Sequence, residues 1–361
     1  MNFQTASKLF KDDQIKKLAE DRDGLRFLKL RLLSRRDKLE QLAEEVGLNI
    51  SRTPSNDLLK KLYDSRINEK KIERFIRRKF LEERATRKKS ENKLVDELYK
   101  LHTFDWGGLH QNSLEKTIVD NYVKKIRRYS ALCKAIDNEL HASLQGYVLC
   151  SWYNHWTSII IEDIFKEQRT VLPAVGLVKK IDFFIDNRPF DLKVTYLPEG
   201  YVATARNNKG LRSELTLLKQ TARRLVVHYD SSLASSKLLE DLWKKLDDHP
   251  STDARKLIAN LKRFRSGIVQ TLKRKPDSLL TWFYENQGVR RFDASNRLFL
   301  VIIDKTDYHN SWKLKRARPL LVKGIQSSLK GAKRAAGRVT RFRWEGKSYT
   351  TISDAIFVTK G

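Results

Sequence analysis

The residues best suited to chemistry lie in the segment 179–197, which reads KKIDFFIDNRPFDLKVTYL. Two carboxylates and an amine, Asp182, Asp191 and Lys193, interrupt runs of β-branched and aromatic residues there. Carboxylate oxygens are the ligands that Mg²⁺ prefers, and a bound metal activates water for attack on a phosphodiester. Burying charge costs free energy unless the charge is paired, so stability alone does not explain this cluster. The pattern predicts a metal-dependent hydrolytic site.

The apolar runs predict two strands of a tight β-hairpin, over 178–186 and 189–196. With Asn187 and Arg188 as the loop, Asp182 would face Lys193. Because side chains alternate along a strand, both of them and Asp191 would share one face. The other face would carry apolar residues toward the core: Ile181, Phe183, Ile185, Phe190, Leu192 and Val194. The structural alternative is an exposed Asp191–Lys193 pair, with Asp182 ion-paired to Lys193 across the strands.

An acidic residue two positions before a lysine is a weak signal, since the chain contains four such pairs. Two of them lie in predicted helices, where residues i and i+2 point apart. A third, Glu345–Lys347, lies at a predicted turn. Only Asp191–Lys193 lies in an apolar strand with an upstream aspartate on the neighbouring strand. The geometry of a strand therefore singles out this pair.

The elements around the hairpin predict an α/β domain. The aromatic and isoleucine-rich run 144–165 predicts a buried helix with Glu162 and Asp163 near its end. The segment 171–178 predicts an edge strand or a connection. The continuous apolar run of 296–304 predicts a central strand with both faces covered.

Helices and a basic tail complete this half of the chain. Residues 209–228 predict one amphipathic helix, and 232–285 predict more helix with breaks at His249-Pro250 and Lys275-Pro276. In the tail, a helix over 320–336, a strand from Arg338, a turn at 345–347 and a final strand over 350–358 are expected.

The first hundred residues predict charged helices, and the glycines of 105–108 predict the boundary of the N-terminal region, 1–104. The remaining domain, 105–361, would hold a core over about 144–304, a helical insertion over about 209–290 and a basic segment over 311–361. For the basic stretch 74–89 three interpretations stay open: a solvated helical face, an arm that holds DNA phosphates, or a short coiled coil for dimerisation.

Charge indicates the partner. The formal net charge is +29 and the sequence pI is about 10.0, which favours a polyanion: nucleic acid first, an anionic membrane surface second. The basic residues expected to contact DNA are Lys209, Arg212, Arg223, Arg224, Lys323, Lys330, Lys333, Arg334, Arg338, Arg341 and Arg343.

The sequence disfavours a membrane-spanning protein, a secreted protein and a histidine metal site. The chain contains no run of 18 apolar residues, so no membrane span is expected, and the N-terminus lacks the apolar core of a signal peptide. Cys133 and Cys150, in apolar surroundings, predict reduced core thiols of a cytoplasmic protein. The histidines form no metal-binding pair.

These residues support a family resemblance. Asp182 followed by Asp191-Leu192-Lys193 resembles the signature of PD-(D/E)xK nucleases, to which restriction endonucleases belong, with Ile181 in place of the signature proline. Glu162 resembles the additional acidic residue of many members. The resemblance covers about 144–304 and implies a restriction-endonuclease-like mixed sheet flanked by helices. It further implies Glu162, Asp182, Asp191 and Lys193 as catalytic residues, with the three carboxylates as metal ligands.

The expected function is thus a Mg²⁺-dependent endonuclease acting on DNA, with Mn²⁺ as a substitute metal. The resemblance alone implies a prokaryotic restriction or anti-phage defence enzyme. Two-strand cleavage suits a homodimer, which the N-terminal helices could provide. The alternatives are a non-catalytic nucleic-acid-binding or architectural protein, and a nuclease acting on RNA or branched DNA.

Overall fold

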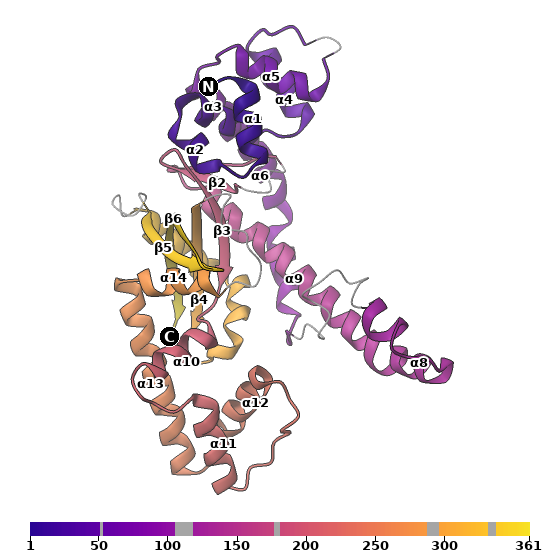
Figure 1. Ribbon diagram of the computed structural model, residues 1–361, viewed down its shortest axis with the longest axis vertical. Helices are drawn as coiled ribbons and strands as arrows, with labels where there is room; N and C mark the ends of the chain where they lie inside the picture. Colours follow the sequence, from indigo (N-terminus) through magenta and orange to yellow (C-terminus); the bar gives the residue numbers. More distant parts are fainter. Residues whose placement is uncertain (51–52, 105–117, 177–180, 287–295, 331–336) are drawn as a thin grey trace. The chain divides into compact units, whose positions relative to one another are not determined.

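The computed structural model describes residues 1–50, 53–104, 118–176, 181–286, 296–330 and 337–361 (Figure 1). These residues form two compact units, one of Met1–Leu81 with Ile164–Gly361 and one of Glu82–Asp163. The predicted boundary at 105–108 lies outside the described residues. Among the helices described, none is long and apolar enough to cross a membrane.

A six-stranded mixed sheet organises the first unit (Figure 1). Its strands run in the order β1-β2-β3-β4-β6-β5. Neighbouring strands are parallel for β3–β4 and β4–β6 and antiparallel for the other three pairs. The strands are β1 (Val171–Pro173), β2 (Phe183–Ile185), β3 (Arg188–Thr195), β4 (Asn296–Asp304), β5 (Arg338–Trp344) and β6 (Lys347–Lys360). The predicted mixed α/β class is confirmed.

Strand β4 is central, as its sequence predicts. It lies between β3 and β6, and every residue of it except Asn296 is buried. The two ends of the sheet also agree with the sequence, because β1 is an edge strand and β5 and β6 form a hairpin. Glu345 and Gly346 turn that hairpin with φ of 45° and 75°.

The β2–β3 hairpin exists, but its predicted register is wrong. Asp186 and Asn187 form the two-residue loop with φ of 47° and 63°, and Arg188 already pairs with Ile185. Two left-handed residues in succession match the twist of a hairpin, and Asp and Asn tolerate that conformation better than Arg. The pairing therefore moves by two residues relative to the prediction. A shift of two leaves each side chain on its predicted face.

Helices cover both faces of the sheet. One face packs against α10 (Glu199–Asn207), α13 (Thr252–Arg274) and α14 (Asp277–Glu285) in one apolar cluster. On the other face α15 (Arg318–Lys330) lies close, so that a Cβ added at Gly324 would stand 2.7 Å from the Val358 side chain.

The predicted breaks in the helical insertion are confirmed, and the single helix over 209–228 is wrong. The chain forms α12 (Ser235–Asp247) and α13 on either side of His249-Pro250, and α14 begins after Lys275-Pro276. Over 209–228 only α11 (Glu214–Arg224) is helical. Gly210, with φ of 66°, follows the end of α10, and the Ser213 side chain caps α11 by accepting from the Thr216 N–H.

The N-terminal region is helical, as predicted. Its helices are α1 (Phe3–Lys11), α2 (Ile15–Glu20), α3 (Arg22–Arg31), α4 (Arg36–Glu45), α5 (Ser55–Asp64) and α6 (Glu69–Tyr99). Within the first unit their apolar residues join Leu172, Ile181 and Phe184 in one cluster. These helices therefore support the edge of the sheet that carries the hairpin.

The second unit contains the C-terminal part of α6, α8 (Tyr129–Ala135) and most of α9 (His141–Lys166). The helix predicted over 144–165 is thereby confirmed. Both cysteines are free: Cys150 is buried and Cys133 is half-buried.

Candidate active site

Asp182 directly precedes β2, and its backbone is hydrogen-bonded to the chain on both sides. Its N–H donates to the Phe190 carbonyl at 2.9 Å, and its carbonyl accepts from the Ala174 N–H at 3.0 Å. The pairing of β2 with β3 ends at Phe183 and Phe190, and the Asp182 N–H bonds to that same Phe190. Asp182 thus lies at the end of this ladder, close to residues 190–192 of β3.

The Asp182 carboxylate also has a structural contact. Its Oδ2 accepts a hydrogen bond from the Leu192 N–H at 2.7 Å. This bond satisfies a backbone donor of β3 just where the β2 ladder ends. The Asp182 carboxylate thus reaches the residue next to Asp191.

Asp191 and Lys193 form an ion pair along β3. The Lys193 Nζ donates to Asp191 Oδ1 at 2.8 Å, and the side chains are 45% and 17% exposed respectively. Residues i and i+2 of a strand share a face, so this contact follows directly from the strand assignment. Asp191 and Lys193 therefore share one face of β3, as predicted, and the place of Asp182 on that face stays a prediction. Lys193 reaches solvent, while the carboxylate beside it is mostly covered.

Arg297 is a fourth charged residue of this site, and it was not predicted from the sequence. It pairs with Asp191 across β3 and β4, and its Nε lies 3.6 Å from Asp191 Oδ2. The guanidinium is buried and lies 5.3 Å from the centre of the Tyr284 ring. Burial raises the pKa of that tyrosine above its usual range. A lone arginine at the start of an otherwise apolar strand was the signal that could have found it.

The donor set suits a hard cation. The carboxylates of Asp182 and Asp191 are the kind of oxygen ligand that Mg²⁺ prefers, and that ion ordinarily keeps several waters and uses few protein ligands. The Lys193 ammonium against Asp191 Oδ1 shows that this carboxylate attracts a cation in the folded chain. Within the described residues, no group of three or more His, Cys, Asp or Glu side chains is arranged to hold a metal.

The two acidic residues at the end of α9 lie in the second unit. Asp163 is buried, and its two oxygens accept from Arg87 at 2.7 and 2.9 Å. Arg84, which pairs with Glu91, lies 3.7 Å away. Asp163 thus has a structural role in its own unit. Glu162 is half-buried on the same helix, and its part in the site stays a prediction.

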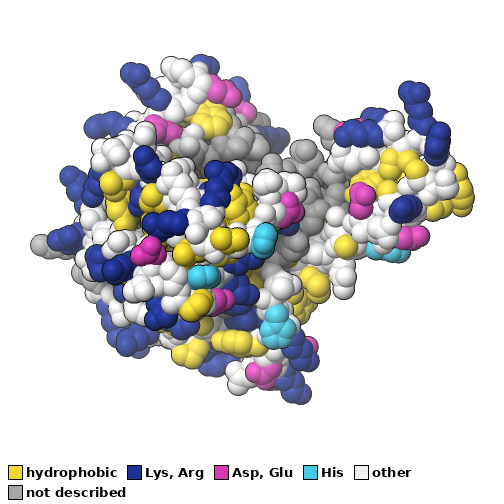
Figure 2. Space-filling model, turned by 90° about the horizontal axis from the view of Figure 1, so that it is seen from below, with side chains coloured by type: hydrophobic (Ala, Val, Ile, Leu, Met, Phe, Trp, Pro, Cys, Tyr) yellow, Lys and Arg dark blue, Asp and Glu magenta, His cyan; other side chains and the backbone are white. Residues whose placement is uncertain are grey.

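The residues predicted to contact DNA lie on several elements of the first unit. Lys209 and Arg212 follow α10, Arg223 and Arg224 end α11, Lys323 and Lys330 lie on α15, and Arg338, Arg341 and Arg343 lie on β5. All of these are exposed except Arg338, which is half-buried and lies 3.5 Å from Asp277 and 3.7 Å from Asp354. Lys333 and Arg334 lie outside the described residues. Figure 2 shows Lys and Arg side chains spread over the face in view, interspersed with acidic ones.

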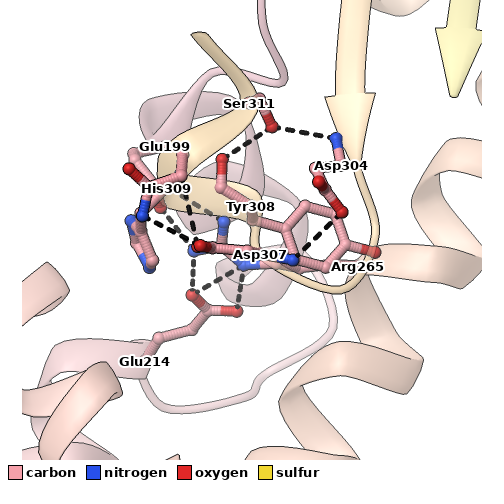
Figure 3. A network of polar contacts seen from close by, with 9 residues as sticks. Glu199, Glu214, Arg265, Asp304, Asp307, Tyr308, His309 and Ser311 are labelled. Atoms are coloured by element: carbon pink, nitrogen blue, oxygen red, sulfur yellow. Dashed lines mark hydrogen bonds and ion pairs between the residues drawn. The ribbon is translucent and has the colours of Figure 1, made fainter. Parts of the chain in front are cut away.

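A second polar cluster, also missed from the sequence, lies among the insertion helices (Figure 3). The buried Arg265 donates to Glu214 at 2.5–3.2 Å and to Glu199 at 2.5 and 2.8 Å. Burial by itself lowers the pKa of this arginine, but the hydrogen bonds with Glu214 and Glu199 outweigh it and the pKa rises. His309 lies 3.7 Å from Glu199 and against the Trp243 ring. Since the arginine pairs with both carboxylates, the cluster joins α10, α11 and α13 structurally.

Comparison of the chain with family models, with curated proteins and with solved structures found no match.

Proposed function

We propose that the chain is a metal-dependent endonuclease that hydrolyses DNA, with a core of the PD-(D/E)xK type. One observation carries the proposal: the Asp182 carboxylate accepts from the Leu192 N–H, one residue from Asp191, and Asp191 is ion-paired with Lys193 on the same strand. A non-catalytic sheet gains little from two carboxylates on neighbouring segments at this point, because like charges there destabilise the pairing.

The proposed roles follow from the side chains. Asp182 and Asp191 would hold the metal, Mg²⁺ or Mn²⁺. The bound ion would supply Lewis-acid stabilisation of the phosphoryl charge and a more acidic water. Lys193, exposed beside Asp191, would orient the attacking water or neutralise the charge that develops on the phosphate. Arg297 would hold Asp191 from the buried side.

The charge of the chain supports a nucleic-acid substrate. A net charge of +29 draws a polyanion toward the protein, although the site itself carries two carboxylates. The metal would let the phosphate approach these acids. Restriction or other anti-phage defence in a prokaryote is the biological role proposed with this activity, and a homodimer suits cleavage of both strands.

A substrate panel tests the proposal. The protein is incubated with plasmid, modified and unmodified phage DNA, single-stranded DNA, branched DNA and RNA, each with Mg²⁺, Mn²⁺ or EDTA. The proposal expects DNA fragments that vanish with EDTA. Cleavage confined to RNA or to branched DNA would change the proposed substrate, and no cleavage of any nucleic acid would count against a nuclease.

One observation favours a second candidate, a nucleic-acid-binding protein without catalysis. Asp191 is already paired with Lys193 and lies close to Arg297, and Asp182 already caps a backbone N–H. These contacts suffice to hold the acids in a purely structural role. Tight retention of DNA together with a complete lack of cleavage would favour this candidate.

A further inference from the structure

A basic groove lies on the N-terminal helices and includes Arg74 and Arg78 of the stretch 74–89, for which an arm that holds DNA phosphates is one interpretation. It has a volume of about 400 Å³ and is bordered by α4 and α6. Its apolar lining includes Leu42 and Phe75, each 1% exposed. The complete lining is Leu42, Glu45, Val46, Lys71, Arg74, Phe75 and Arg78.

The two acids in the N-terminal part of α6 pair with a lysine of another helix, which leaves the cations of α6 at this groove. Residues 69–81 contain six Lys or Arg and two acids. Both acids, Glu69 and Glu73, accept from the buried Lys29 at 2.8 and 2.7 Å. The three cations of the groove recur at spacings of three and four residues, which places them on one face of the helix. The interior of the unit therefore neutralises the acids and leaves this helical face basic.

One carboxylate lies among the groove cations. Glu45 pairs with Arg78, and both side chains are about half exposed. Exposed pairs of this kind contribute little free energy, so a stronger anion can compete for the arginine. The Arg78 guanidinium also lies 5.2 Å from the centre of the Phe75 ring, which keeps it at the groove. Lys71 and Arg74 are exposed beside it.

We propose that this groove binds backbone phosphates of a nucleic acid. Its three cations outnumber its single carboxylate, and its aromatic residue is buried, so it offers charge to phosphates and no stacking surface to bases. It would thus contribute affinity without sequence preference. The inference deepens the proposed function by adding a second DNA-contacting surface, and it rests on that function for the identity of the ligand alone.

The test measures the salt dependence of DNA binding by the full chain. A fluorescent 20-base-pair duplex is titrated in EDTA at about 50 to 200 mM salt, with fluorescence anisotropy as the readout. The groove variant is Lys71→Ala/Arg74→Ala. The matched control is Lys16→Ala/Lys17→Ala on α2, which removes the same charge from exposed positions outside the groove. A charge-preserving variant, Lys71→Arg/Arg74→Lys, shows that the groove tolerates substitution.

Loss of two phosphate contacts flattens the slope of log affinity against log salt by about 1.8. Raising the salt over this range should therefore weaken DNA binding by the groove variant roughly tenfold less than it weakens binding by wild type. The control and the charge-preserving variant should retain the wild-type slope. Equal flattening by the control, or an unchanged slope in the groove variant, would overturn the inference. A groove variant that loses binding to phosphatidylserine vesicles but keeps its binding to DNA would also overturn the inference. The assay needs no hydrolysis, so a chain that cuts nothing can still confirm this groove.

Discussion

At the scale of single residues, Asp191 contacts an exposed cation on one side and lies near a buried one on the other. Lys193 pairs with one carboxylate oxygen, and Arg297 lies near the other. The two cations differ in what they can reach. Lys193 is 45% exposed and can meet a substrate, whereas Arg297 is buried and can act only through Asp191.

The exposed lysine gives the first prediction. Lys193→Ala should lower the cleavage rate by roughly 10²- to 10³-fold, because a positioned charge at a phosphoryl site stabilises the transition state by several kcal/mol. The affinity for DNA in EDTA should change less than about twofold, since distant phosphate contacts supply most of it. The control is Lys347→Ala, which removes an exposed lysine that likewise has an acidic residue, Glu345, two positions before it. If both variants lose the same activity, the assignment of Lys193 is wrong.

His309 gives a prediction of pH dependence. Burial lowers the pKa of His309 below its usual value, and Arg265 adds to this, while Glu199 and Asp307 oppose it. The unfolded chain therefore binds the proton more readily, with a pKa of about 6.5, and stability rises with pH in this range. The His309 contribution should be complete above about pH 6.5 and lost as the pH falls through the lower folded pKa.

Urea unfolding between about pH 7.5 and pH 5 measures this effect. The variant His309→Gln should lose less free energy of unfolding on acidification than wild type does. His228→Gln, at an exposed histidine, is the control and should behave as wild type. An acid response in His309→Gln as steep as that of wild type would contradict the assigned cause.

At the scale of elements, the hairpin shows what the sequence could and could not predict. The alternation of residues 181–194 predicted both strands and which side chains share a face. The register depended on which two residues turn the chain, and the observed loop is Asp186 and Asn187. Asn187 and Arg188 fit the same apolar pattern, because a shift of two residues keeps every face. Only the energetics of left-handed backbone distinguishes these two loops.

The loop gives a prediction of stability. Asn187 has φ of 63°, so Asn187→Val should lower the free energy of unfolding by about 1–2 kcal/mol, because a branched side chain clashes in this conformation. Asn187→Gly should be neutral or slightly stabilising. Chemical denaturation of both variants provides the measurement. Equal stability of the two would contradict the observed turn, and with it the observed register of β2 against β3.

Arg265 gives the second prediction at this scale. Arg265→Met should lower the free energy of unfolding by about 3–5 kcal/mol, because it leaves the buried Glu214 without its partner. The double variant Arg265→Met/Glu214→Gln should recover part of this loss, since both charges are then absent. Chemical denaturation of the two single variants and the double variant forms a double-mutant cycle. Strictly additive losses would show that the pair is not coupled.

At the scale of the whole molecule, the element order was largely predictable and the organisation into units was not. The apolar run of β4, the final hairpin and the proline breaks of the insertion follow from local sequence. The cluster that joins the N-terminal helices to Ile181 and Phe184 depends on contacts between distant segments. Arg297 and Arg265 were missed for the same reason, because their partners are brought to them by the fold.

The charge of the molecule is distributed, which sets the expected division between binding and catalysis. Basic residues expected to contact DNA lie on the insertion helices, on α15 and on β5, and the groove of α4 and α6 adds another set. At the site, the hairpin contributes Lys193 to this positive charge. Binding and hydrolysis should therefore be separable by substitution, which is the basis of the decisive experiment.

That experiment compares wild type with Asp191→Asn, with Asp186→Asn at the neighbouring turn as the matched control. Cleavage of the best DNA substrate in Mg²⁺ and binding to the same DNA in EDTA are measured for each protein. The account predicts that Asp191→Asn loses cleavage by at least about 10³-fold, since it removes a metal ligand, while binding is retained. Asp186→Asn should keep both. Undiminished cleavage by Asp191→Asn would contradict the proposed active site.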